Sequence, residues 1–97
     1  MADHFGPTIR TLYSKPYTTS GGATTEAVTI TTDDNTDVLT TDTVYVHVQT
    51  PGTNSIQACP ATISAVNTVT LAPQVAGGTA TDPSSDCVVS ILITRNY

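Results

Sequence analysis

The polar side chains whose types and spacing could support chemistry gather first in one acidic stretch. Asp33, Asn35 and Asp37 have the D-x-N-x-D spacing that opens a calcium-binding loop. Such a loop also needs a glycine at its sixth position and a bidentate glutamate at its twelfth, where this chain has Val38 and Val44. The stretch is therefore expected to be an acidic turn between two strands, without a bound metal.

The two cysteines, Cys59 and Cys87, allow two interpretations. They could be free buried thiols, which suits synthesis in a cytoplasm, or they could form one disulfide that closes a loop of about 28 residues. In the chain-entropy picture such a link contributes about 3–4 kcal/mol. A zinc site needs four ligands, and the chain offers only these cysteines with His4 and His47, without paired C-x-x-C spacing. No cofactor is predicted.

No arrangement of residues predicts an enzyme. His47 lies in an alternating segment, on the side that is expected to face water, so it is interpreted as a surface or interface residue. The chain has neither a nucleophile elbow of the G-x-S-x-G kind nor a glycine-rich loop that could hold phosphate. A non-enzymatic function is therefore expected.

Composition limits the partners of the chain. Its 97 residues correspond to one domain, and only three of them are Lys or Arg, for a net charge of -5. A nucleic-acid-binding surface needs clustered basic residues, so that class is not expected. No apolar run reaches the length of a membrane-spanning helix, and residues 1–7 do not resemble a secretory signal, so we expect synthesis in a cytoplasm.

The elements that must position these residues are strands. Val44, Val46 and Val48 alternate with polar residues over 43–50, which predicts a strand with one buried face. Similar segments span 26–32, 61–65, 68–72 and 87–95, with a weaker one at 38–40 and turns at Pro51-Gly52 and Val66-Asn67. The segment 87–95 is apolar on much of both faces, which is typical of a central strand. The predicted fold is all-β: a small antiparallel sandwich or barrel of about six short strands with an extended N-terminal arm.

Residues 1–22 are predicted to form that arm, and residues 23–97 the β domain. Gly6-Pro7, Lys15-Pro16 and Gly21-Gly22 interrupt the segment, and its apolar residues follow no regular period. A purely floppy tail has little use for so many large apolar side chains, so the arm is expected to dock on a partner. The expected partner-binding residues are Phe5, Ile9, Arg10, Leu12, Tyr13, Lys15 and Tyr17.

The order of strand and turn residues over 40–96 resembles a known family. Asp42-Thr43-Val44 enters a strand, Gly52-Thr53-Asn54 turns, and Ile63-Ser64-Ala65-Val66 leads into Val69-Thr70-Leu71-Ala72-Pro73. Asp86-Cys87-Val88-Val89-Ser90 then begins a final strand that ends in Arg95. This order is similar to that of small β-rich structural proteins of tailed-bacteriophage virions, including capsid decoration (cement) and fibre proteins.

The resemblance implies a virion accessory protein that binds the capsid surface and stabilises it. Its expected partners are the major capsid protein or another virion protein, and further copies of itself in a trimer, with no nucleic acid and no membrane. Two other classes stay open: a pilus or fibre subunit that assembles by strand donation, and a small receptor- or carbohydrate-binding β module.

Overall fold

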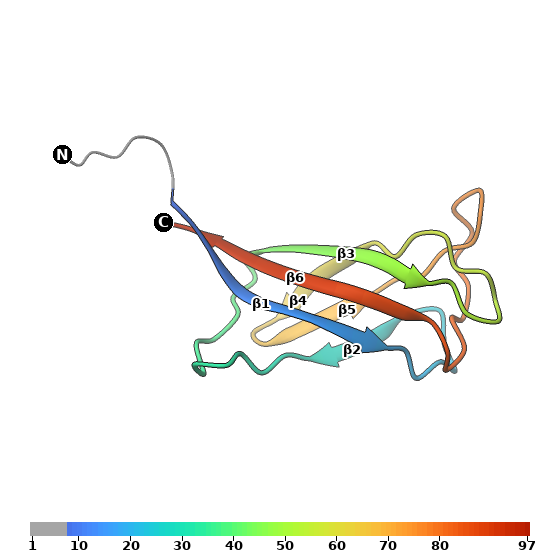
Figure 1. Ribbon diagram of the computed structural model, residues 1–97, viewed down its shortest axis with the longest axis horizontal. Coiled ribbons are helices and arrows are strands. Elements are labelled where there is room, and N and C mark those ends of the chain that lie inside the picture. Colours follow the sequence, from blue (N-terminus) through green and yellow to red (C-terminus); the bar gives the residue numbers. More distant parts are fainter. Residues whose placement is uncertain (1–7) are drawn as a thin grey trace.

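The computed structural model describes residues 8–97, which form two three-stranded antiparallel sheets packed face to face (Figure 1). One sheet has the strand order β1-β6-β3 and the other β2-β5-β4. This confirms the predicted all-β fold, with the sandwich rather than the barrel as its form. Within the described residues no helix is long and apolar enough to cross a membrane. The strands are β1 (Ile9–Thr18), β2 (Glu26–Thr29), β3 (Thr43–Thr50), β4 (Ala61–Ala65), β5 (Thr68–Leu71) and β6 (Val88–Asn96).

Strand β6 is the central strand of its sheet and pairs with both β1 and β3. Val89, Ile91 and Ile93 on its inner face are all at most 1% exposed. β-branched residues stiffen the side chain and fill a pleated surface well, which suits this run to a deeply buried strand. The prediction that the last segment is central is confirmed.

The second sheet is built around the β4–β5 hairpin. Its two-residue turn is Val66-Asn67, and Asn67 has a φ of 57°, a left-handed conformation that asparagine tolerates better than most residues. The register shifts between Ile63 and Ala65, so a bulge precedes the turn. The turn predicted at these two residues is confirmed.

The weak strand predicted at 38–40 is absent. Val38 is fully buried, but both of its backbone groups bond to the hairpin turn. Its N–H donates to the side-chain oxygen of Asn67 at 2.7 Å, and its carbonyl accepts from the N–H of Asn67 at 2.8 Å. The segment is therefore a buried connection held by one asparagine, because no neighbouring strand is available to pair with it.

Most of the predicted N-terminal arm lies within the first sheet. Residues 9–18 form β1, which pairs with β6 from Ile9 opposite Asn96 to Thr18 opposite Val88. β6 needs a hydrogen-bonding partner on that side, and β1 supplies one. The first sheet therefore contains strands from both the predicted arm and the predicted β domain. Gly21, one of the two glycines predicted to end the arm, follows shortly after β1. A Cβ added to Gly21 would come within 2.6 Å of the Ser84 backbone. Residues 1–7 lie outside the described residues.

The inner face of β6 should dominate the stability of the domain. Replacing Ile91 by alanine removes buried methyl groups and leaves a cavity, so we expect the free energy of unfolding to fall by about 2–5 kcal/mol. Ser90→Ala, one position away on the outer face, should change it by about 0.5 kcal/mol or less. Urea denaturation of both variants measures the difference, and equal effects would contradict this assignment of the two faces.

Candidate functional site: an uncharged sheet face and the groove beside β3

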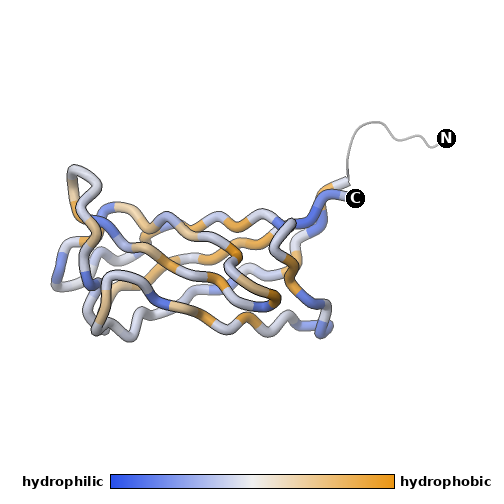
Figure 2. The backbone as a smooth tube through the Cα atoms, turned by 180° about the vertical axis from the view of Figure 1, so that it is seen from behind, coloured by the Kyte–Doolittle hydropathy of each residue, from blue (hydrophilic) through white to orange (hydrophobic). Residues whose placement is uncertain are grey.

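The acidic side chains are engaged in holding the loops. In Figure 2 the most hydrophilic segments lie at the loops and strand ends, while apolar residues line the middle of the strands. Five carboxylates accept backbone N–H groups: Glu26 from Ser20 and Gly21, Asp34 from Thr36, Asp42 from Leu39, Asp82 from Gly22 and Ser84, and Asp86 from Thr53. Acceptors of this kind satisfy loop amides that have no strand partner.

The acidic stretch that begins at Asp33 forms the predicted turn. Asn35 has a φ of 61°, and the Thr32 hydroxyl donates to the carbonyl of Thr36 at 2.8 Å across it. Asp33 accepts from Lys15 at 2.9 Å, and Asp37 accepts from the Asn67 side chain at 2.9 Å. Among the described residues, no group of three or more His, Cys, Asp or Glu side chains could hold a metal ion.

The ion pair between Asp42 and Arg95 is the best-enclosed one. Asp42 is 2% exposed in its side chain and accepts from Nε and Nη2 of Arg95 at 2.7 and 2.8 Å. The same guanidinium donates to the carbonyl of Asp37 at 2.8 Å. The hydrogen bonds from Arg95 lower the pKa of Asp42, against the opposing effect of burial, and the Leu39 N–H adds to the lowering. The pair thus ties the loop before β3 to the end of β6.

The Asp42–Arg95 pair should stabilise the fold at neutral pH, and this stabilisation should be lost in acid. Because the folded-state pKa of Asp42 is lowered, its contribution is complete above the unfolded pKa of about 3.9 and is lost as pH falls through the folded value. We expect Asp42→Ala to lower the melting temperature clearly at pH 7, since a guanidinium loses its partner. Asp33→Ala is the matched control, because Asp33 is 88% exposed and its pair with Lys15 is screened by solvent. Equal melting temperatures for the two variants, measured by circular dichroism, would refute this difference.

The two cysteines are free thiols buried in the core, which decides between the two interpretations that the sequence left open. Cys59 is 5% exposed and Cys87 is fully buried. Burial raises the pKa of Cys59 to about 11, and it also raises the pKa of Cys87, to which the nearby charge of Asp86 contributes. A thiol of this kind is a poor nucleophile at neutral pH.

Thiol alkylation tests this state. With a pKa of about 11, about one thousandth of the Cys59 side chains are thiolates at pH 8. We therefore expect very slow reaction with iodoacetamide in the folded protein. In denaturant both cysteines should react at the rate of a free peptide thiol. A denatured protein that shows no reactive thiol until a reductant is added would demonstrate a disulfide instead.

Six of the seven residues predicted to bind a partner lie on β1, but several of them are used by the fold itself. Leu12 is 8% exposed and belongs to the core, so it is not available to a partner. Tyr13 and Tyr17 are half-buried and pack against the core. The Tyr17 hydroxyl donates to Glu26, which joins the two sheets at this side.

The remaining predicted residues divide between paired and exposed ones. Arg10 pairs with Asp34, and Lys15 pairs with Asp33, so both bases bridge β1 to the turn that follows β2. Ile9 is 65% exposed and is the one described apolar residue of the set that remains accessible. Phe5 lies outside the described residues.

The outer face of the β1-β6-β3 sheet is free of formal charge. The strand register places Ser14, Leu92 and Tyr45 in one row across the sheet, and Pro16, Ser90 and His47 in the next. Tyr45 is 56% exposed. The face as a whole consists of Thr11, Ser14, Pro16, Thr18, Val88, Ser90, Leu92, Thr94, Thr43, Tyr45, His47 and Thr50.

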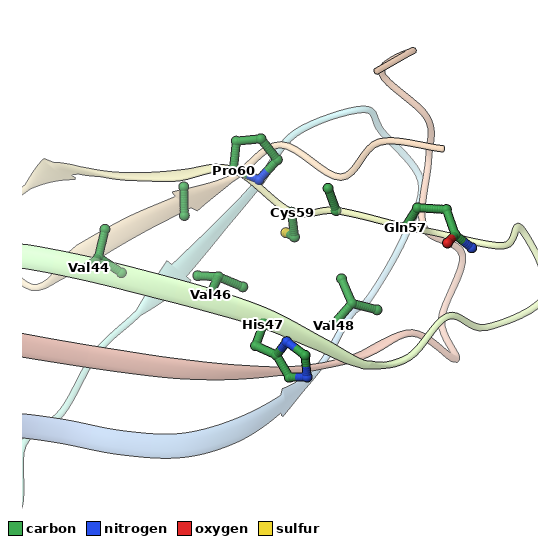
Figure 3. A pocket seen from close by; sticks show the side chains of 9 residues that line it. Val44, Val46, His47, Val48, Gln57, Cys59 and Pro60 are labelled. Atoms are coloured by element: carbon green, nitrogen blue, oxygen red, sulfur yellow. The ribbon is translucent and has the colours of Figure 1, made fainter. Parts of the chain in front are cut away.

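A groove of about 360 Å³ lies between β3 and the segment that leads into β4. Figure 3 shows Val44, Val46 and Val48 pointing from β3 toward Cys59 and Pro60, with His47 on the opposite side of the strand. These valines are only half-buried, so the face that was predicted to be buried is the wall of an open groove. The alternation itself is as predicted.

Comparison with family models, with curated proteins and with solved structures found no match for this chain. Any role for the sheet face and the groove is therefore inferred only from the geometry of this chain. Sequence reasoning identified the period of β3 and the second apolar face of β6, but it could not show that the two strands are neighbours. One signal in the sequence could have indicated the face. Residues 43–50 and 88–94, which form the two strands, contain no charged residue.

Proposed function

We propose that this chain is a non-enzymatic structural protein of a virus particle, of the capsid decoration (cement) type. It binds the protein surface of the capsid and stabilises it. The observation that carries the proposal is the uncharged outer face of the β1-β6-β3 sheet, in a chain whose net charge is -5. The resemblance of residues 40–96 to small virion proteins supports the same class.

A face without charges is well suited to protein contact. Removing a charged group from water costs several kcal/mol unless it is paired, whereas Thr, Ser and Tyr side chains lose much less. Tyr45 supplies an aromatic side chain with a polar tip, the type enriched among residues that dominate binding energy. The neighbouring Leu92 gives it an apolar base on the central strand.

The size of the face indicates how it would be used. Three strands of about eight residues cover about 400 Å² from their standard spacings. A stable interface buries about 800 Å² on each partner, so this face supplies about half of it. We propose that residues 1–9 of the predicted arm add contact area to it, and that several copies bind together as a trimer. Multivalent attachment then strengthens a modest individual contact.

Binding to undecorated capsids tests the proposal. Ser90→Lys places a charge in the centre of the face, and we expect it to weaken co-sedimentation with capsids about tenfold or more. Thr62→Lys adds the same charge to the exposed side of β4 in the other sheet and is the matched control. Both variants should melt near the wild-type temperature, since both positions face outward.

The arm can be tested separately. Deleting residues 1–7 leaves β1 intact, and we expect the shortened protein to fold and to bind capsids more weakly. Deleting residues 1–20 instead removes β1 with Leu12, so it should unfold the domain and cannot report on docking. Unchanged binding by both the Ser90→Lys variant and the 1–7 deletion would refute the proposed function.

A further inference from the structure

We propose that β3 is a pairing edge that joins a second copy of this chain, strand to strand, in an antiparallel arrangement about a two-fold axis. The two β1-β6-β3 sheets would then continue into one another. This inference goes beyond the proposed function, because it concerns the edge of the sheet and not its outer face. A two-fold contact joins copies in pairs, so it is a different contact from the one that would form the proposed trimer.

The two edges of this sheet differ in how they are protected. β1 carries Arg10, Lys15 and Pro16 and has an irregularity between Thr11 and Tyr13. Lysine, proline and bulges are the devices by which natural sheets prevent pairing at an edge. β3 spans eight residues without a charge, a proline or a glycine, and its register shifts only at the end, between Val48 and Thr50. Both edges have one irregularity, so the charged residues and the proline of β1 are what distinguish its edge from the unprotected edge of β3.

The backbone of β3 has hydrogen-bonding capacity left. The strand pairs with β6 on one side, and within residues 8–97 no backbone group of 43–50 bonds to another segment on the other side. An edge of this length offers a row of unpaired N–H and C=O groups. The other sheet presents shorter edges, with four residues in β2 and five in β4.

The groove beside β3 suits a strand that carries a row of apolar side chains. Val44, Val46 and Val48 are half-buried in a single copy and line the groove of about 360 Å³. When β3 pairs with its own copy, the inward valines of the second strand fall on the same side of the joined sheet. Each strand then closes the open side of the other copy's groove, and the six valines share one apolar layer.

The charge distribution is compatible with a second copy as the occupant. A chain of net charge -5 repels its own copies, but the seven described acids lie in loops and at the start of β2, outside β3. Self-pairing therefore sets no like charges opposite one another, which would be unfavourable in a cross-strand pair. An isologous contact also needs only one self-complementary surface.

Amide hydrogen exchange followed by NMR at low and high protein concentration tests the pairing. We expect every second amide of Thr43–Thr50 to exchange at least about tenfold more slowly at high concentration, as outward N–H groups gain partners. The outward amides of β1 serve as the internal control, because they belong to the protected edge and should show no change. No concentration dependence in β3, or the same dependence in β1, would overturn the proposal.

A pair of variants separates the edge from the outer face. Gln57 is exposed at the mouth of the groove, and Gln57→Lys should raise the dissociation constant about tenfold in sedimentation equilibrium. Ser14→Lys adds the same charge to the outer face of β1 and should leave the constant unchanged. The reverse result would assign self-association to the outer face and refute edge pairing. The Ser90→Lys variant should bind capsids more weakly, but its β3 amides should still exchange more slowly at high protein concentration. Failure of one proposal can therefore be distinguished from failure of the other.

Discussion

The structure depends on the pairing of β6 with a strand on each side. Its inner row is almost completely buried, and each of the two neighbouring strands is aligned by its register with that row. Because β6 is central, its backbone groups are satisfied on both edges, and its two faces can serve different purposes. The inner face forms the core, and the outer face forms the uncharged surface to which we assign binding.

Polar interactions then determine where the loops lie. The domain has few charges, and most of its acids accept backbone N–H groups or pair with a base across the sandwich. The Asp42–Arg95 pair joins the loop before β3 to the end of β6 and thereby fixes the start of the strand that borders the groove. Since the acids are used in this way, the negative charge of the protein is concentrated at the loops and leaves the sheet surface uncharged.

The same arrangement leaves two surfaces without cover. The outer face of the β1-β6-β3 sheet is broad and uncharged, and the β3 edge combines unpaired backbone groups with half-buried valines. Exposed apolar side chains and unprotected sheet edges are characteristic of proteins that assemble. In the proposed structural role, the face would contact the partner and the β3 edge would join copies in pairs. The β1 edge, which carries charges and a proline, would not pair further.

The sequence by itself determined most of the strands and turns of this protein. Alternation over 43–50 and 87–95, and the turn residues Pro51-Gly52 and Val66-Asn67, depend on neighbours a few positions away, and these elements lie where they were predicted. The central position of β6 could also be predicted, because the strand is apolar on much of both faces.

Only the tertiary structure decided which strands meet. Pairing of β1 with β6 joins residues that lie 70 or more positions apart, and no local pattern specifies such a partner. For the same reason the sequence suggested a separate arm where the sheet has an edge strand, and it treated Leu12 as a contact residue although it is buried. The free state of the two cysteines, the partners of the acids and the open groove all follow from long-range packing, in which a residue's role depends on what the fold brings against it.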